Sequence, residues 1–121
     1  MIAADTSALI AFLEGLPGQD IEQLGAAAAG GNLVLPPVTI VEALGAAKQL
    51  QAILRNLTLL EVTPGYWDRA GRNRRLLREK GLKANLGDTL IAQSCIDHGV
   101  PLITRDGDFR HFAKYCGLKL A

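Results

Sequence analysis

The chain has 121 residues, of which 49% are hydrophobic and 21% charged, and its formal net charge is +1. This length suits one domain with its own core, and the apolar share excludes a disordered chain, so we expect a single domain over residues 1–121. The two cysteines, Cys95 and Cys116, lack metal-ligand spacing, and neither a secretory signal nor an uninterrupted apolar span is present. We therefore expect a cytoplasmic protein without a membrane segment.

The first part of the chain alternates apolar runs with amphipathic stretches. Residues 2–4 predict a strand, and residues 7–14 predict a helix because their apolar side chains recur at helical spacing. Asp20 is expected to cap a second helix, which the Gly30–Gly31 pair ends. Residues 33–35 then predict a buried strand.

The middle of the chain predicts one long helix and one strand. Thr39–Glu42 has the Thr-x-x-Glu pattern of a capping box, and the helix that it opens is expected to run to about Arg55, with a break near Gly45. Residues 57–62 are rich in branched side chains and predict the next strand.

The second half begins with a basic helix over residues 64–80, for which Thr63 is the expected N-cap. Asn85 caps the next helix, which ends at Gly99. The remaining elements are, in order, a strand at residues 100–104, a turn at 105–108, a helix at 109–116 and a candidate last strand at 118–120. Because apolar strands alternate with helices, we expect a three-layer α/β/α fold with a mainly parallel central sheet.

Four acidic residues follow predicted strands directly or lie in the first turn of a later helix: Asp5, Glu42, Asp88 and Asp106. In a parallel sheet, residues just past the strand ends collect along one edge. Taken singly, each has a structural explanation: Glu42 closes a capping box, Asp88 favours the helix dipole and Asp106 begins a turn. Their joint occurrence instead predicts a shared site.

A cluster of carboxylates needs a positive partner, because two unit charges about 4 Å apart repel by roughly 1–4 kcal/mol. Oxygen ligands favour Mg²⁺ or Mn²⁺ over zinc, and neither histidine is near the predicted strand ends. Such an ion can activate water and stabilise charge on a phosphate. The acids therefore predict hydrolysis of a phosphodiester without a side-chain nucleophile.

Four parts of the sequence resemble the PIN-domain ribonucleases, in particular the VapC-type toxins of toxin-antitoxin pairs. They are residues 5–10 (Asp-Thr-Ser-Ala-Leu-Ile), Glu42, residues 88–92 (Asp-Thr-Leu-Ile-Ala) and residues 102–109 (Leu-Ile-Thr-Arg-Asp-Gly-Asp-Phe). The resemblance spans essentially the whole chain. Thr89 stands where the family more often has a small apolar residue, and residues 38–41 are more apolar than usual, but neither departure removes a predicted ligand.

The resemblance implies that the catalytic residues are Asp5, Glu42, Asp88 and Asp106. The metal ligands that it implies are Asp5, Asp88, Asp106 and Asp108. The hydroxyl groups implied to support the site by hydrogen bonds are those of Thr6, Ser7 and Thr104. Which of Asp106 and Asp108 is the principal metal ligand stays open, and we favour Asp106 because it is nearer the strand. The resemblance also implies endonuclease action on RNA with Mg²⁺ or Mn²⁺, inhibition by a small antitoxin protein, and a homodimer.

Seven of the thirteen basic residues fall between residues 69 and 83. On the predicted helix, Arg69, Arg72 and Arg75 lie near one side and could hold an RNA backbone, whose phosphates attract such clusters regardless of sequence. A solvated helix face, or a surface for an acidic partner, explains these arginines equally well.

Other functions of acidic α/β proteins fit less well. A haloacid-dehalogenase-like phosphatase needs Asp-x-Asp after its first strand, where this chain has Asp5-Thr6-Ser7. A phospho-accepting receiver needs paired early acids and a late lysine. The remaining alternative is a non-catalytic PIN-like module that binds RNA or a protein, and we favour catalysis because all four acidic positions are filled.

Overall fold

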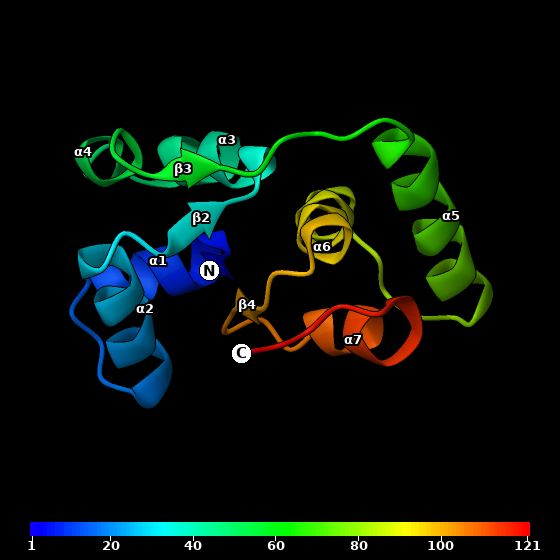
Figure 1. The fold of residues 1–121 in the computed structure, drawn as a ribbon. Coiled ribbons are helices and arrows are strands. Elements are labelled where there is room, and N and C mark those ends of the chain that lie inside the picture. Colours follow the sequence, from blue (N-terminus) through cyan, green and yellow to red (C-terminus); the bar gives the residue numbers. More distant parts are fainter.

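The computed structural model describes all 121 residues as a four-stranded sheet with helices on both faces (Figure 1). The sheet has the order β3-β2-β1-β4, and all neighbouring strands are parallel. The strands are β1 (Ile2–Ala4), β2 (Leu33–Leu35), β3 (Thr58–Leu59) and β4 (Leu102–Ile103). The predicted three-layer α/β/α fold with a parallel sheet is confirmed.

Seven helices connect and cover these strands. They are α1 (Thr6–Leu13), α2 (Gln19–Ala29), α3 (Pro37–Ala46), α4 (Leu50–Leu54), α5 (Tyr66–Glu79), α6 (Leu86–His98) and α7 (Phe109–Cys116). None of them combines the length and the apolar composition that a membrane-spanning helix requires.

Successive residues of each strand face opposite sides of the sheet, so two cores form. One core contains Ala3 and Leu102 together with buried side chains of α5, α6 and α7. The other contains Ala4 and Ile103 together with buried side chains of α1, α2, α3 and α4. Figure 1 shows α1 and α2 on one side of the central strands and α5, α6 and α7 on the other. The central strands are apolar throughout because both of their faces are covered.

Parallel pairing aligns the carboxyl ends of β1 and β4. Ala4 pairs with Ile103, and the backbone N–H of Asp5 donates to the carbonyl of Ile103 at 3.2 Å. The residues that follow each strand therefore begin side by side, at the edge where parallel α/β sheets bind their ligands.

Two predicted strands are shorter than their apolar runs, and a third does not form. β3 keeps two of residues 57–62, and both are exposed because this strand pairs with β2 alone at the sheet edge. β4 keeps two of residues 100–104. Residues 118–120 form no further strand and contribute only an isolated parallel bridge between Leu120 and Leu102.

The predicted caps of α2 and α3 are wrong. Gly18 is the N-cap of α2, and the carboxylate of Asp20 accepts a hydrogen bond from Arg105 instead. Pro37 begins α3 because proline fits the first turn of a helix, where its missing N–H costs nothing. Thr39–Glu42 consequently lies inside the helix and forms no capping box.

The starts and ends of two further helices also differ. Gly65, with a φ of +82°, is the N-cap of α5, while the predicted cap, Thr63, donates a hydrogen bond to Asp97. The helix predicted from Thr39 to Arg55 is divided into α3 and α4, because Ala47 has extended backbone angles. The division lies two residues after the break predicted at Gly45.

Asp97 joins α6 to α5 through a partly buried polar network. Its side chain is only 8% exposed and accepts from Arg69 Nη2 (2.7 Å), Arg69 Nε (3.0 Å) and Gln93 Nε2 (2.8 Å). Gln93 in turn accepts from Asn73 Nδ2 at 2.7 Å. Although burial alone would raise it, the bonds from Arg69 and Gln93 hold the pKa of Asp97 below its usual value. The network ties α5 to α6, the helix whose first turn carries Asp88.

We predict that Asp97→Ala lowers the free energy of unfolding by about 1–3 kcal/mol, because it leaves the partly buried donors of Gln93 and Arg69 unpaired. Urea denaturation measures this change. The matched control is Arg72→Ala, which removes an ion pair whose partners are 70% and 66% exposed and should change stability by less than about 1 kcal/mol. Equal losses in the two variants would show that the network does not hold α5 in place.

Candidate metal centre

The carboxylates of Asp88, Asp106 and Asp108 meet at the carboxyl edge of the sheet. One oxygen from each lies within 4.8 Å of the others. Asp88 is in the first turn of α6, after the N-cap residue Asn85, and Asp106 and Asp108 lie between β4 and α7. These three residues are called the aspartate triad below. They come from distant parts of the chain and are partly buried, so the site depends on the fold.

The turn that carries Asp106 and Asp108 is held by its own side chains. Asp106 Oδ1 accepts from the backbone N–H of Asp108 at 2.9 Å, and the N–H of Asp106 donates to Thr104 Oγ1 at 3.0 Å. Aspartate commonly makes such bonds to the backbone two residues ahead. They hold both aspartates close to the end of β4.

Asp5 is the most buried acid of the site, with 3% exposure. Its Oδ1 accepts from the backbone N–H of Ala8 (2.9 Å), which caps α1, and from Ser7 Oγ (2.8 Å). Its Oδ2 accepts from Thr104 Oγ1 at 2.6 Å. Burial raises the pKa of Asp5, while the bonds from Thr104, Ala8 and Ser7 oppose that rise. Asp5 thus joins the ends of β1 and β4 and lies beside the triad, outside its 4.8 Å group.

Glu42 reaches the site from α3. Its Oε1 accepts from Thr6 Oγ1 at 3.2 Å. A Cβ atom at Gly87 would lie 2.6 Å from Glu42 Oε2, so the glycine before Asp88 leaves room for this carboxylate. One turn before Glu42, Thr39 Oγ1 is buried without a hydrogen-bond partner. A buried hydroxyl of this kind is costly unless a water or another polar group satisfies it.

The acids act on one another electrostatically. Burial, followed by repulsion from Asp106, Glu42, Asp108 and Asp5, raises the pKa of Asp88 to about 6. The structure therefore brings the four acids singled out in the sequence to one place, together with Asp108. It also places the hydroxyls of Thr6, Ser7 and Thr104 on these carboxylates.

Two basic residues next to the site were given no role at the site from the sequence. Lys83 Nζ lies 3.2 Å from Asp108 Oδ2. Arg105 donates from Nε to Asp20 Oδ2 at 2.7 Å and from Nη2 to the carbonyl of Pro17 at 2.8 Å, which ties the loop after β4 to the start of α2. Their partners are far away along the chain, so only the folded structure reveals these contacts.

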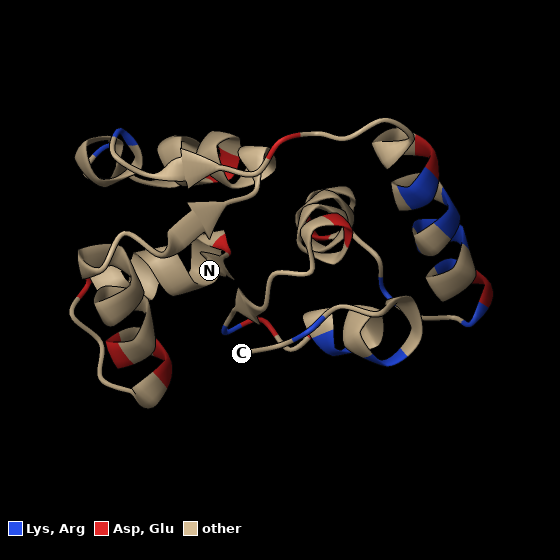
Figure 2. Cartoon of the chain, viewed as in Figure 1, with Lys and Arg blue, Asp and Glu red and all other residues tan.

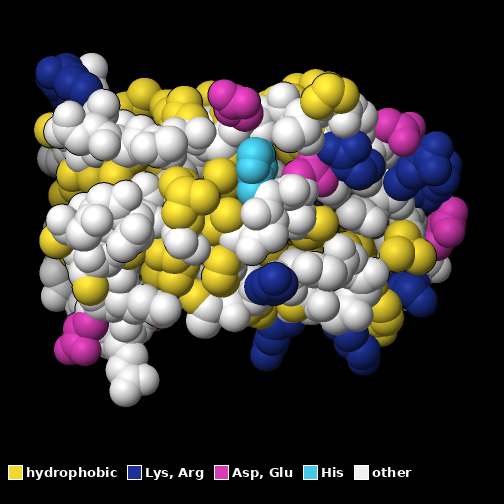
Figure 3. Space-filling view, viewed as in Figure 1, with side chains coloured by type: hydrophobic (Ala, Val, Ile, Leu, Met, Phe, Trp, Pro, Cys, Tyr) yellow, Lys and Arg dark blue, Asp and Glu magenta, His cyan; other side chains and the backbone are white.

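The three arginines proposed to bind RNA have different surroundings on α5. Arg69 is bonded to Asp97, whereas Arg72 and Arg75 pair with Asp68 (2.8 Å) and Glu79 (4.0 Å) on the same helix. Figure 2 shows the basic residues along α5 with acids near both of its ends, and in Figure 3 this helix carries much of the basic surface of the visible face. RNA binding by Arg69, Arg72 and Arg75 stays a prediction, and Arg69 has the fewest free donors for it.

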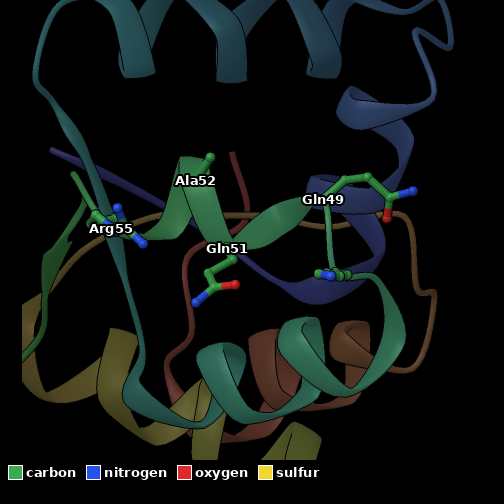
Figure 4. A pocket seen from close by; sticks show the side chains of 5 residues that line it. Gln49, Gln51, Ala52 and Arg55 are labelled. Atoms are coloured by element: carbon green, nitrogen blue, oxygen red, sulfur yellow. The ribbon is translucent and has the colours of Figure 1, made fainter.

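A polar hollow beside α4 offers no comparable chemistry. It is lined by Lys48, Gln49, Gln51, Ala52 and Arg55 and contains no acid. Figure 4 shows the side chains of Gln49 and Gln51 pointing in different directions rather than toward a common centre. The aspartate triad is therefore the better candidate for a functional site.

The chain matches the family model described as "PIN domain" over residues 2–115. The chain belongs to the PIN domain family. The resemblance seen in the sequence is thereby confirmed. A comparison with curated proteins gives no match for this PIN domain.

Solved structures share the fold of this PIN domain. A chain in the crystal structure of VapBC2 from Rickettsia felis, bound to a promoter DNA fragment, has 20% identity and a TM-score of 0.76, covering 100% of this chain and 98% of that chain. A chain of FitAcB from Neisseria gonorrhoeae has 17% identity and a TM-score of 0.73, covering 99% and 96%. A chain of DNA-bound VapBC from Salmonella typhimurium has 19% identity and a TM-score of 0.67, covering 100% and 98%. At these identities the likeness concerns the fold.

The chemistry of the site fits a hard divalent cation. The triad supplies oxygen atoms only, the donors that Mg²⁺ and Mn²⁺ prefer. Burial, together with the surrounding carboxylates, raises the pKa of Asp88 and so disfavours its charged form, and a bound dication would relieve the repulsion among the carboxylates.

We predict that the cation-free protein loses stability as the pH rises. The folded-state pKa of Asp88, about 6, exceeds its usual 3.8, so the folded state holds this proton more tightly than the unfolded state. The free energy of unfolding contributed by Asp88 is greatest below about pH 4 and falls by about 1–2 kcal/mol as the pH passes 6, after allowance for solvent screening.

Urea denaturation in a chelator at pH 4.5 and 7.5 checks this prediction. Asp88→Asn should remove part of the decline and stabilise the protein at pH 7.5, whereas the exposed control Asp68→Asn should behave as the wild type. If the wild type and Asp88→Asn show the same pH dependence, the carboxylates do not repel as described.

Proposed function

We propose that the chain is an endoribonuclease that depends on Mg²⁺ or Mn²⁺ and hydrolyses phosphodiester bonds. The observation that carries the proposal is the aspartate triad, whose oxygens lie within 4.8 Å of one another at the carboxyl edge of a parallel sheet. Membership of the PIN domain family, whose members are generally nucleases, supports it. RNA as the substrate comes from the resemblance to VapC-type ribonucleases.

Asp88, Asp106 and Asp108 would hold the cation, together with Asp5, which the resemblance also makes a ligand, and Glu42 would add negative charge beside it. Asp106 is favoured over Asp108 as the principal ligand, because Asp108 shares Oδ2 with Lys83. When bound, the cation lowers the pKa of a water and stabilises charge on the phosphate and the leaving oxygen. The protein's own groups position this chemistry: Ser7 and Thr104 orient Asp5, and Thr6 orients Glu42. Glu42, whose Oε1 accepts from Thr6, would accept a proton from the attacking water.

We also propose that the chain is the toxin of a toxin-antitoxin pair and works in the cytoplasm. The fold shared with chains of VapBC2, VapBC and FitAcB supports this role. A small antitoxin protein would then inhibit it. A homodimer is proposed on the same resemblance, and apolar side chains such as Val41 (74% exposed) and Trp67 (65% exposed) are available for contacts with other chains.

We predict that the purified wild-type protein cleaves members of a panel of cellular RNAs when Mg²⁺ or Mn²⁺ is added and does not cleave them in a chelator. Asp88→Asn and Asp106→Asn should each lower the cleavage rate by at least about a hundredfold, because removing a ligand weakens the hold on the cation that stabilises developing charge. Gel analysis of the products under single-turnover conditions measures these rates.

The matched control is Glu22→Gln, an exposed acid of α2, which should cleave at the wild-type rate. Cleavage that survives both the chelator and Asp88→Asn would contradict the proposed mechanism. RNA binding without any cleavage by the wild type would instead favour a non-catalytic PIN-like binding module.

A further inference from the structure

Lys83 is the only basic side chain that forms an ion pair with a member of the aspartate triad. Its Nζ lies 3.2 Å from Asp108 Oδ2, and the two side chains are 62% and 31% exposed. An ion pair this exposed contributes little to folding stability. The placement of Lys83 therefore calls for an explanation other than the stability of the fold.

The backbone on both sides of Lys83 is held in place. The N–H of Leu82 donates to the carbonyl of Leu77 at 3.0 Å, and the carbonyl of Ala84, a buried residue, accepts from Arg74 Nε at 2.9 Å. Lys83 thus projects from a short, anchored connection between α5 and α6. Its ammonium is kept at the triad, while more than half of the side chain faces solvent.

The other basic groups around this edge are engaged elsewhere. Arg105 is bonded to Asp20 and to the carbonyl of Pro17, and Arg110 Nε donates to the carbonyl of Gly107. Lys83 alone offers an ammonium next to the carboxylates. An ammonium has three rotatable donors, so it can change partner without moving the backbone.

A divalent cation at the triad would change the electrostatic forces on Lys83 and Asp108. Asp108 would be attracted by two positive charges in place of one, and the ammonium and the cation would repel each other. A phosphodiester that approaches the cation brings negative oxygens to the same place, and lysine binds phosphate as a point charge.

We propose that Lys83 is a substrate-binding residue, which exchanges Asp108 for a phosphate oxygen of the RNA once the triad holds its cation. This inference rests on the proposed function and adds to it a residue outside the acidic set. The inference predicts opposite effects on two kinds of binding, because the ammonium of Lys83 repels the cation and attracts the phosphate of the substrate. Removing it should therefore strengthen one kind of binding and weaken the other.

The test compares Lys83→Met with Lys83→Arg and with the control Lys48→Met, an exposed lysine that makes no ion pair. Calorimetry with Mn²⁺ and the protein alone should show about fivefold tighter binding for Lys83→Met. Fluorescence anisotropy with a single-stranded RNA in Ca²⁺, with the RNA checked for intactness on a gel, should show about fivefold weaker binding. The slope of log affinity against log salt should fall by the value for one phosphate contact, about 0.7. Lys83→Arg should keep most of the RNA affinity.

Two outcomes would overturn the inference, and a third would overturn the proposed function instead. If Lys83→Met binds Mn²⁺ and RNA as the Lys48→Met control does while the wild type cleaves RNA, Lys83 does not bind substrate and the proposed function stands. Weaker Mn²⁺ binding by Lys83→Met would make Lys83 a support of the cation site and would equally overturn it. If the wild type shows no cation-dependent cleavage but Lys83→Met still loses RNA affinity and salt slope, Lys83 remains a phosphate contact and the nuclease proposal fails.

Discussion

Mutual repulsion among carboxylates is the constraint on which this site depends. Asp88 is held where burial and four other acids raise its pKa to about 6, and Asp106 and Asp108 have oxygens within 4.8 Å of it. A small domain tolerates such an arrangement only if the rest of the structure holds the acids together and a positive charge can enter among them. Lys83 supplies a single positive charge beside Asp108.

The parallel sheet, with the hydrogen bonds and ion pairs at its edge, holds the acidic residues close together. Pairing of β1 with β4 places Asp5 beside Thr104, and the hydrogen bond between them closes the sheet edge. The bond from Arg105 to Asp20 fixes the loop after β4 against α2. The network around Asp97 ties α5 to the second half of α6, the helix whose first turn carries Asp88. Stability of the fold and geometry of the site are thus linked through a few charged contacts.

The sequence predicted the layers and the acids better than the details that connect them. Apolar runs revealed β1 and β2, because strands buried on both faces must be apolar, and the positions of Asp5 and Asp106 after such runs placed them at one edge. The caps at Asp20, Thr39 and Thr63 were mispredicted. Asp20 and Thr63 bond to residues distant in the sequence, and α3 begins at Pro37, before Thr39. Contacts such as Lys83 with Asp108 join distant residues and leave no local trace.

The central claim is that Asp88, Asp106 and Asp108 together hold a hard divalent cation. The most direct measurement is X-ray diffraction from crystals grown with Mn²⁺, with anomalous difference maps calculated at the manganese edge. The account predicts a manganese peak bonded to oxygens of all three aspartates, and its loss in crystals of Asp88→Asn. A map without manganese at these residues, at concentrations that support RNA cleavage, would contradict it.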